Sequence, residues 1–184
     1  MNIEEFTSFD PEKPIQYTDQ EKEELAKSER KWLFGPVETA LNYILADDTP
    51  ESGYCVLDYG CGNHRSMLKR LRKRNLFENY GYDIDFPTCS LKGTYDVVTA
   101  SNVLNIQPSV THMSQVLSQI AHLSHEHLIF NYPSSPRRTI KSNAEFRRFL
   151  DNHELNKKVH KLVLTHSGIL VIARKKRIRS RECE

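Results

Sequence analysis

From residue 55 to residue 174 the sequence alternates short apolar segments with segments of helical period. Short apolar segments bounded by turn residues are typical of buried strands, and helical segments between them are typical of crossovers between parallel strands. Only residues 166–168 separate the last two apolar segments, which is too short for a crossover and predicts an antiparallel hairpin. The alternation therefore predicts an α/β fold with a doubly wound, mostly parallel sheet that ends in this C-terminal hairpin.

The boundaries of the expected elements follow from the apolar pattern and from turn and capping residues. Thr18 and Glu21 form a capping-box pattern that begins the first helix, and Gly35-Pro36 ends it. We expect strands at 55–59, 79–82, 96–100, 127–132, 158–165 and 169–174, and helices at 18–34, 36–46, 66–74, 110–123 and 143–152. These elements divide the chain into a flexible arm (1–17), an N-terminal helical lid (18–52), a sheet-forming core (53–176) and a basic tail (177–184).

A glycine-rich turn follows the first expected strand. The chain reads Asp58-Tyr59-Gly60-Cys61-Gly62 here, and the glycines allow a tight turn whose backbone can approach a ligand closely. About 20 residues later Asp83 ends the next strand, at the spacing where a carboxylate accepts hydrogen bonds from ribose hydroxyls. Two separate features therefore predict one nucleoside-binding site at the carboxyl ends of the first two strands.

The details of this turn distinguish between nucleoside cofactors. A dinucleotide fingerprint needs a third glycine at position 65, where this chain has Arg65, so a nicotinamide or flavin cofactor is disfavoured. The pattern of an acid followed by two glycines, Asp58, Gly60 and Gly62, resembles motif I of class I S-adenosylmethionine-dependent methyltransferases. Residues 95–105 are similar to the fourth-strand motif of the same superfamily, and the short chain resembles its small phage and bacterial members.

The resemblance implies a Rossmann-like fold, the cofactor S-adenosylmethionine and methyl transfer as the activity. It also implies that the two glycines lie against the methionine part and that Asp83 holds the ribose. The residues to which it assigns cofactor binding are Asp58, Tyr59, Gly60, Cys61, Gly62, Asp83, Ile84, Ser101, Asn102 and Val103. No metal ligand is expected.

One element of that family's sheet does not fit into this sequence. Residues 84–95 contain Pro87 and Gly93 and are too few for a helix and a strand, since a crossover alone needs about 10 to 12 residues. We therefore expect the third strand to be missing or vestigial. The acid that commonly faces adenine after that strand is then absent, and its substitutes would be Asp85, Phe86, Cys89, Ser90 and Leu91.

The methyl acceptor is left open by the sequence. Enzymes that methylate exocyclic amino groups of DNA bases carry a Pro-Pro-aromatic loop after the fourth strand, where this chain has Ser101-Asn102-Val103-Leu104. Carbon-5 cytosine methylation normally uses a Pro-Cys nucleophile, and this chain has Pro87-Thr88-Cys89 instead. A small molecule and a nucleic acid both stay open as acceptors. The alternative function is a catalytically silent methyltransferase-like module that binds a nucleic acid or a protein partner.

Methyl transfer depends more on alignment than on acid or base catalysis, because the cofactor itself activates the methyl group. A general base is therefore optional. The candidates for positioning the acceptor or removing its proton are His64, Asn102, Asn105 and Tyr132, all expected at the carboxyl edge of the sheet. Each of them can instead be a structural hydrogen-bond partner, because loops at a sheet edge contain polar groups that need partners.

Aromatic residues near the N-terminus allow two interpretations. Trp32 and Phe34 are expected to pack the N-terminal helices onto the sheet, as large aromatic side chains usually do. In the alternative, residues 17–46 form a lid over the sulfonium, and Tyr17 or Trp32 closes the site against water.

Positive charge is concentrated outside the N-terminal segment. Residues 1–30 contain nine acidic and four basic side chains, so the net charge of +2 leaves +7 for the rest of the chain. Arg137 and Arg138 follow a strand at the binding edge and are the candidates for holding phosphates of an acceptor, whereas helix 64–74 could simply present a solvated basic face. A nucleic acid is therefore one candidate partner.

The remaining composition predicts a cytoplasmic protein. Cys55, Cys61, Cys89 and Cys183 lack the spacing of a metal site or a disulfide framework and are interpreted as free thiols. The first ten residues have no signal-peptide pattern, and the longest apolar run, 169–173, is too short to cross a bilayer. We expect no membrane association, and the oligomeric state is not predicted.

Overall fold

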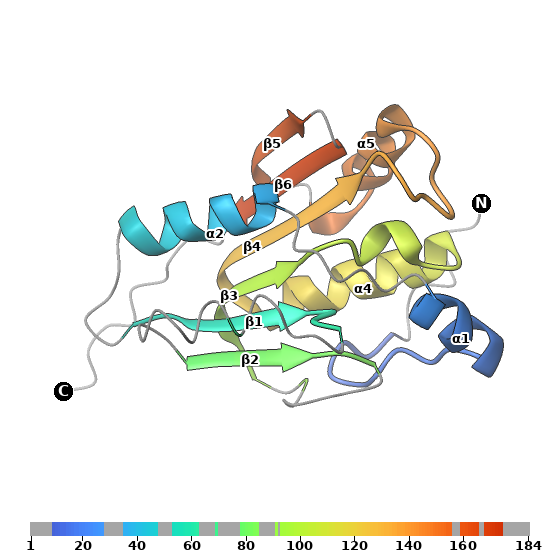
Figure 1. Cartoon of the computed structure of the whole chain (residues 1–184), viewed down its shortest axis with the longest axis horizontal. Coiled ribbons are helices and arrows are strands. Elements are labelled where there is room, and N and C mark those ends of the chain that lie inside the picture. Colours follow the sequence, from blue (N-terminus) through green and yellow to red (C-terminus); the bar gives the residue numbers. More distant parts are fainter. Residues whose placement is uncertain are drawn as a thin grey trace.

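The computed structural model describes residues 9–27, 35–47, 53–62, 69, 78–84, 91, 93–155, 159–165 and 168–174. Six strands form one sheet in the order β2-β1-β3-β4-β6-β5 (Figure 1). The strands are β1 (Cys55–Tyr59), β2 (Glu78–Tyr82), β3 (Tyr95–Ala100), β4 (Ser124–Pro133), β5 (Val159–Thr165) and β6 (Gly168–Arg174).

Four neighbouring strands of this sheet are parallel. β1 pairs with β2 and with β3, and β3 pairs with β4, so the carboxyl ends of these strands meet at one edge. β6 runs antiparallel to both β4 and β5. The prediction of a Rossmann-like, mostly parallel sheet that ends in an antiparallel hairpin is therefore confirmed.

The segment between β2 and β3 agrees with the expected loss of a strand. The structure describes residues 83–84, 91 and 93–94 of this segment, and none of these residues is in a strand. Among the described strands, β2 is the outer one on this side of the sheet. The proposed adenine substitutes Asp85, Phe86, Cys89 and Ser90 lie outside the described residues, and Leu91 is buried in the core.

Helices cover both faces of the sheet (Figure 1). The described helices are α1 (Asp19–Lys27), α2 (Gly35–Asp47), α4 (Val110–Leu123) and α5 (Asn143–Asp151), with a short 3-10 turn, η2 (Leu104–Ile106). Ser109 and Ser142 cap α4 and α5 by accepting hydrogen bonds from backbone amides, as their positions before helical segments predict. Of the expected helix at 66–74 the structure describes only Lys69, which is helical.

The alternation of β-strand side chains assigns each face its own core. Val56 of β1 packs with Val37 and Leu41 of α2 on one face, whereas Leu57 of β1 packs with residues of α4 and α5 on the other. The helix α2 was expected in the N-terminal lid, and it contributes to the core of the sheet. No helix in the described part of the chain is long and apolar enough to cross a membrane.

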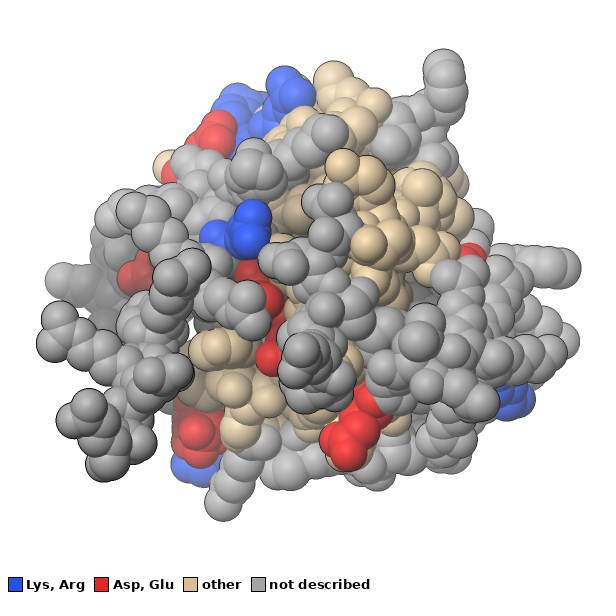
Figure 2. Space-filling view, turned by 90° about the vertical axis from the view of Figure 1, so that its left-hand side faces the viewer, with Lys and Arg blue, Asp and Glu red and all other residues tan. Residues whose placement is uncertain are grey.

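The amino edge of the sheet has a mixed charge. Figure 2 shows this edge, where the acidic and basic side chains of the described residues are interspersed. The opposite, carboxyl edge of the sheet contains α1 and the ends of β1 to β4 (Figure 1).

Candidate functional site

The glycine turn after β1 is held against the end of β2. Gly60 has a φ of +74° and Gly62 a φ of +59°, which is the left-handed region that glycine adopts readily. The amides of Gly60 and Cys61 both donate to the carbonyl oxygen of Tyr82, at 2.7 and 3.2 Å. The turn is therefore fixed at the point where β1 and β2 end together.

Asp83 places a carboxylate beside this turn. Its Oδ2 accepts a hydrogen bond from the amide of Gly62 at 3.0 Å, and the residue is only partly buried. A carboxylate that is anchored by one oxygen and partly exposed can also accept hydrogen bonds from a ligand. The two features that the sequence analysis assigned to one nucleoside site, the glycine turn and the acid about 20 residues later, are in direct contact.

The loop after β3 packs against the glycine turn. A Cβ atom placed on Gly60 would lie 2.4 Å from Cγ2 of Val103, so no larger residue fits there without movement of Val103. Val103 itself is buried. Gly60 is thus required by the packing of these two loops as well as by its backbone conformation.

Asp58 is a buried acid beneath the turn. It is 5% exposed, and Oγ1 of Thr99 lies 3.2 Å from its Oδ1 and donates a hydrogen bond. Burial raises the pKa of Asp58 to about 7, against the lowering effect of the Thr99 hydrogen bond, and the nearby Asp83 adds a smaller rise. A carboxyl group of this kind is partly protonated at neutral pH.

Asn102 has a left-handed backbone that Asn131 supports. Its φ is +61°, which is uncommon for a residue other than glycine. The side chain of Asn131, at the end of β4, accepts from the backbone amide of Asn102 at 2.7 Å and donates to its side-chain oxygen at 2.9 Å. Sequence analysis did not assign Asn131 a role in this site, although strained backbone of this kind is concentrated at functional sites.

Two buried polar atoms near Asn102, Oγ of Ser101 and Oδ1 of Asn105, have no hydrogen-bond partner among the residues that the structure describes. Asn105 is 1% exposed, and its amide nitrogen donates to the carbonyl oxygen of Pro136 at 2.9 Å, which fixes the orientation of the amide. A buried acceptor without a donor costs about 1 to 3 kcal/mol. Oδ1 of Asn105 therefore fits a ligand group that donates a hydrogen bond, such as an amino or hydroxyl group, and the Ser101 hydroxyl can pair with a donor or an acceptor.

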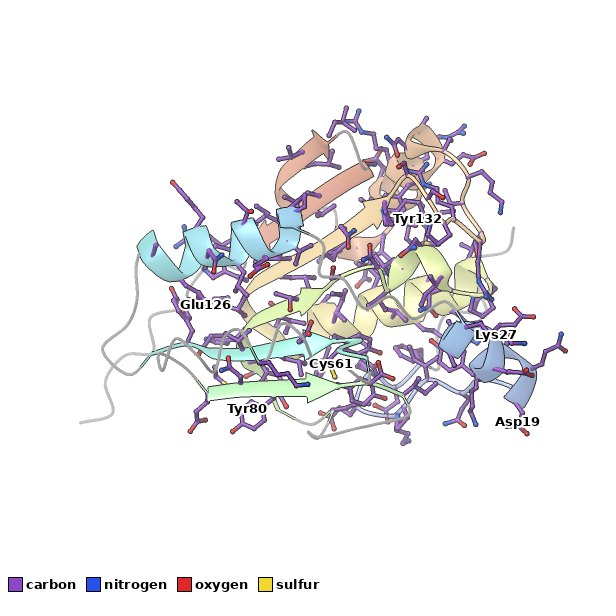
Figure 3. The ribbon with its side chains drawn as sticks, viewed as in Figure 1. Asp19, Lys27, Cys61, Tyr80, Glu126 and Tyr132 are labelled. Atoms are coloured by element: carbon purple, nitrogen blue, oxygen red, sulfur yellow. The ribbon has the colours of Figure 1, made fainter. Side chains whose placement is uncertain are left out.

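Tyr132 is packed into the core below the same edge (Figure 3). It is 0% exposed, and its hydroxyl donates to the carbonyl oxygen of Ile140 at 2.6 Å. Its ring stacks on Phe146 with centroids 3.9 Å apart. Burial raises the pKa of Tyr132 to about 12, although Arg137 lowers it, so the hydroxyl stays protonated at neutral pH.

Replacing Tyr132 by phenylalanine tests whether this hydroxyl is structural. We expect the free energy of unfolding to fall by about 1 to 2 kcal/mol, because the Ile140 carbonyl loses its donor, while cofactor affinity stays unchanged. Urea unfolding and calorimetric titration measure the two quantities. Tyr43→Phe is the matched control, since Tyr43 is 71% exposed on α2. A normal stability with impaired methyl transfer would instead support a catalytic hydroxyl.

Arg137 and Arg138 lie in the loop after β4, and both guanidinium groups have protein partners. Arg138 forms an ion pair of 2.6 Å with Glu24 of α1 and also donates to the Glu24 carbonyl oxygen at 2.7 Å. Arg137 donates to the carbonyl oxygen of Pro133 at 2.6 Å and lies over the ring of Tyr132. Their role as phosphate ligands stays a prediction, because an acceptor would have to compete with these contacts.

The structure brings most of the predicted residues to one edge of the sheet. Cys61 follows β1 (Figure 3) and Ile84 follows β2, and both are partly buried. Ser101 and Asn105 follow β3. His64 lies outside the described residues. Within the described ranges no three His, Cys, Asp or Glu residues are arranged to hold a metal ion.

The N-terminal arm reaches this edge, which the sequence pattern did not specify. The hydroxyl of Tyr17 donates to Oε1 of Gln107 at 2.8 Å, and Gln107 lies just after η2. Sequence analysis considered Tyr17 as a residue that closes a lid but gave Gln107 no role. No local period or motif marks a contact between residues so far apart in the chain.

Comparison with known proteins connects this site to a family. A family model described as a methyltransferase domain matches residues 29–165. No curated protein sequence matches the chain. The fold is similar to magnesium protoporphyrin IX methyltransferase from Synechocystis PCC 6803 with bound S-adenosylmethionine, with a TM-score of 0.52 and 19% identity over 88% of this chain and 87% of that one. It is also similar to an rRNA methylase from Escherichia coli, with a TM-score of 0.53 and 13% identity over 76% of this chain and 63% of that one.

Proposed function

Because the chain belongs to the methyltransferase-domain family, whose methyl donor is S-adenosylmethionine, we propose that it binds this donor at the carboxyl ends of β1 and β2. The methyl group passes to an acceptor that enters beside the carboxyl ends of β3 and β4. The observation that carries the proposal is the hydrogen bond between Asp83 and the Gly62 amide, which joins the acid to the glycine turn.

Each part of this edge has a task in the proposed reaction. The glycine turn allows close approach of its backbone to the methionine part, and Asp83 accepts hydrogen bonds from the ribose hydroxyls. When bound, S-adenosylmethionine supplies a methyl group that its sulfonium has already activated, so the protein contributes mainly alignment. Asn105 provides a buried acceptor atom, and Ser101 provides a hydroxyl that can donate or accept, for polar groups of the cofactor or of the methyl acceptor.

The loop after β4, residues 134–142, carries three basic side chains and no acidic one, which favours an anionic acceptor, and a nucleic acid is the first class to test. Lys141 of this loop is exposed, as are Arg147 and Arg148 of α5, whose Phe146 stacks on Tyr132 near the end of β4. Cations in this position raise the local concentration of an anion and lose this effect at high salt. The second class is an anionic small molecule, which the same cations would attract. Its binding should depend less on salt than the binding of a nucleic acid, because fewer charges take part.

Transfer of labelled methyl groups tests this proposal. Purified protein is incubated with methyl-labelled S-adenosylmethionine and with total RNA, denatured DNA or a small-metabolite extract, at low and high salt. We expect incorporation into an anionic fraction that falls with salt and is reduced by Arg148→Gln. Arg174→Gln is the matched control, because Arg174 is exposed and lies opposite His127 in the register of β6 and β4, toward the other edge of the sheet. Cofactor binding without incorporation in any fraction would contradict the proposed transfer.

A further inference from the structure

The N-terminal strap, residues 9–18, runs past the carboxyl ends of β1 and β2 beside α4 (Figure 1). Ile15 of the strap is buried in the same core as Tyr59 and Tyr82, and Phe9 and Tyr17 pack against that core. Tyr59 and Tyr82 directly precede Gly60 and Asp83 in the chain. The strap therefore lies against the residues that directly precede the glycine turn and Asp83.

Gln119 of α4 connects the strap to the end of β1. It is 0% exposed, its Oε1 accepts a hydrogen bond from the hydroxyl of Tyr59, and its Nε2 donates to the carbonyl oxygens of Pro11 and Lys13 at 3.0 and 2.8 Å. One side chain thus bridges the residue before the glycine turn and two backbone groups of the strap. If the strap leaves, the donor atoms of this amide lose both partners.

Gln107 makes the corresponding connection at the end of β3. It is 3% exposed, and its Oε1 accepts from the hydroxyl of Tyr17 at 2.8 Å while its Nε2 donates to the carbonyl oxygen of Val103 at 2.9 Å. Val103 is the residue that packs against Gly60. A second buried amide therefore links the strap to the loop that forms the other wall of the glycine turn.

His112 fixes the strap between these two connections. Its ring stacks on Tyr17 with centroids 4.8 Å apart, and its Nε2 lies 3.1 Å from the carbonyl oxygen of Gln16. The strap is consequently held along its length by side chains of α4 and of the loop before it. Gln119 contacts Tyr59, just before the glycine turn, and Gln107 contacts Val103 in the loop after β3. Displacement of the strap would therefore loosen the support of both the glycine turn and this loop.

We propose that the strap completes the cofactor site and that Gln107 and Gln119 are positioning residues, through which docking of the strap and binding of the cofactor stabilise each other. This inference rests on the proposed function, because it concerns the same cofactor site. Coupling between two binding events is reciprocal, so a cofactor that favours the docked strap must bind more weakly when the strap is loosened. A strap that only covers the core would lower stability without changing cofactor affinity.

The test uses the full chain and S-adenosylhomocysteine as the probe. Tyr17→Phe removes the hydroxyl that donates to Gln107 and keeps the ring on His112, so the fold should tolerate it. We expect affinity for S-adenosylhomocysteine to fall about 3- to 10-fold, the effect of losing one hydrogen bond. Gln119→Met removes both connections of that side chain and should lower affinity further. Tyr43→Phe, the same change at an exposed tyrosine of α2, should leave affinity unchanged.

Hydrogen exchange supplies the reciprocal measurement. In the wild-type protein, S-adenosylhomocysteine should slow exchange of the amides in residues 9–18, and Tyr17→Phe should reduce this protection. Equal affinity of wild type and Tyr17→Phe, or no protection of the strap by the bound probe, would overturn the coupling while leaving the proposed function intact. A wild-type protein that binds neither S-adenosylmethionine nor S-adenosylhomocysteine would overturn the proposed function and this inference with it.

Discussion

Replacing Asp83 by alanine is expected to weaken the binding of S-adenosylmethionine and of S-adenosylhomocysteine by about 10- to 150-fold. The change removes charge-assisted hydrogen bonds to the ribose, worth about 1.5 to 3 kcal/mol, and it also releases the Gly62 amide from its acceptor. Isothermal titration measures both affinities directly. Asp83→Asn should lie between wild type and Asp83→Ala, because an amide oxygen can still accept from Gly62 but has no charge.

Asp96 offers a matched control for this experiment. Its Oδ2 accepts a hydrogen bond from the backbone amide of Cys55 at 2.8 Å, which is the same type of contact at the opposite edge of the sheet. Asp96→Ala should lower the free energy of unfolding and leave cofactor affinity unchanged. Equal affinities for wild type and Asp83→Ala would remove Asp83 from the cofactor site, even if the protein is a methyltransferase.

The strands and the mostly parallel sheet with its C-terminal hairpin could be predicted because the apolar pattern and the turn residues are local signals. The bounds of β1 and α4 agree with the prediction, since each begins at a clear change of pattern and α4 has a serine cap. β4 begins earlier than expected, at Ser124 instead of residue 127, because the chain turns directly from α4 into the strand. The polar residues at the start of β4 concealed this extension from an analysis based on apolar runs.

The core of the candidate site was also predictable, because glycines and an acid at fixed spacing have a geometric meaning. The pair formed by Asn102 and Asn131 was not, and neither were the connections of Gln107 and Gln119. Buried amide side chains have no period and no characteristic spacing, and their partners lie far away in the chain. The role of each buried amide depends on which polar groups the tertiary fold brings near it, and the local sequence does not contain that information.

The glycine turn by itself does not distinguish a methyltransferase from a silent binding module. The close approach of Gly60 to Val103 requires a glycine whether or not a cofactor binds. The hydrogen bond from Gly62 to Asp83 likewise stabilises the turn by itself. Oγ of Ser101 and Oδ1 of Asn105 are different, because no contact among the described residues satisfies them. Together with the partly exposed carboxylate of Asp83, they are the features of this edge that favour a ligand.

The buried acid Asp58 should give the protein an unusual dependence of stability on pH. An unfolded aspartate has a pKa of 3.8, whereas burial raises the pKa of Asp58 to about 7 in the folded protein. The folded state therefore retains a proton that the unfolded state loses. The stability that this retained proton gives the folded state is fully present below about pH 4 and is lost progressively as the pH rises to about 7. Above that pH, Asp58 is ionised in both states, so the unfolding free energy no longer changes with pH on its account. A difference of about three pKa units corresponds to about 4 kcal/mol of unfolding free energy.

Asp58→Asn isolates this contribution from those of other groups. Asparagine keeps an oxygen that can accept from Thr99 but cannot ionise. The variant therefore does not lose unfolding free energy through ionisation at this position as the pH rises. We expect its unfolding free energy, relative to wild type, to increase by about 4 kcal/mol between pH 4 and pH 7 in urea titrations. Asp151→Asn, at an exposed residue of α5, is the control and should show no comparable trend. A constant difference between Asp58→Asn and wild type would mean that Asp58 ionises freely, and the acid beneath the glycine turn would then be a permanent negative charge.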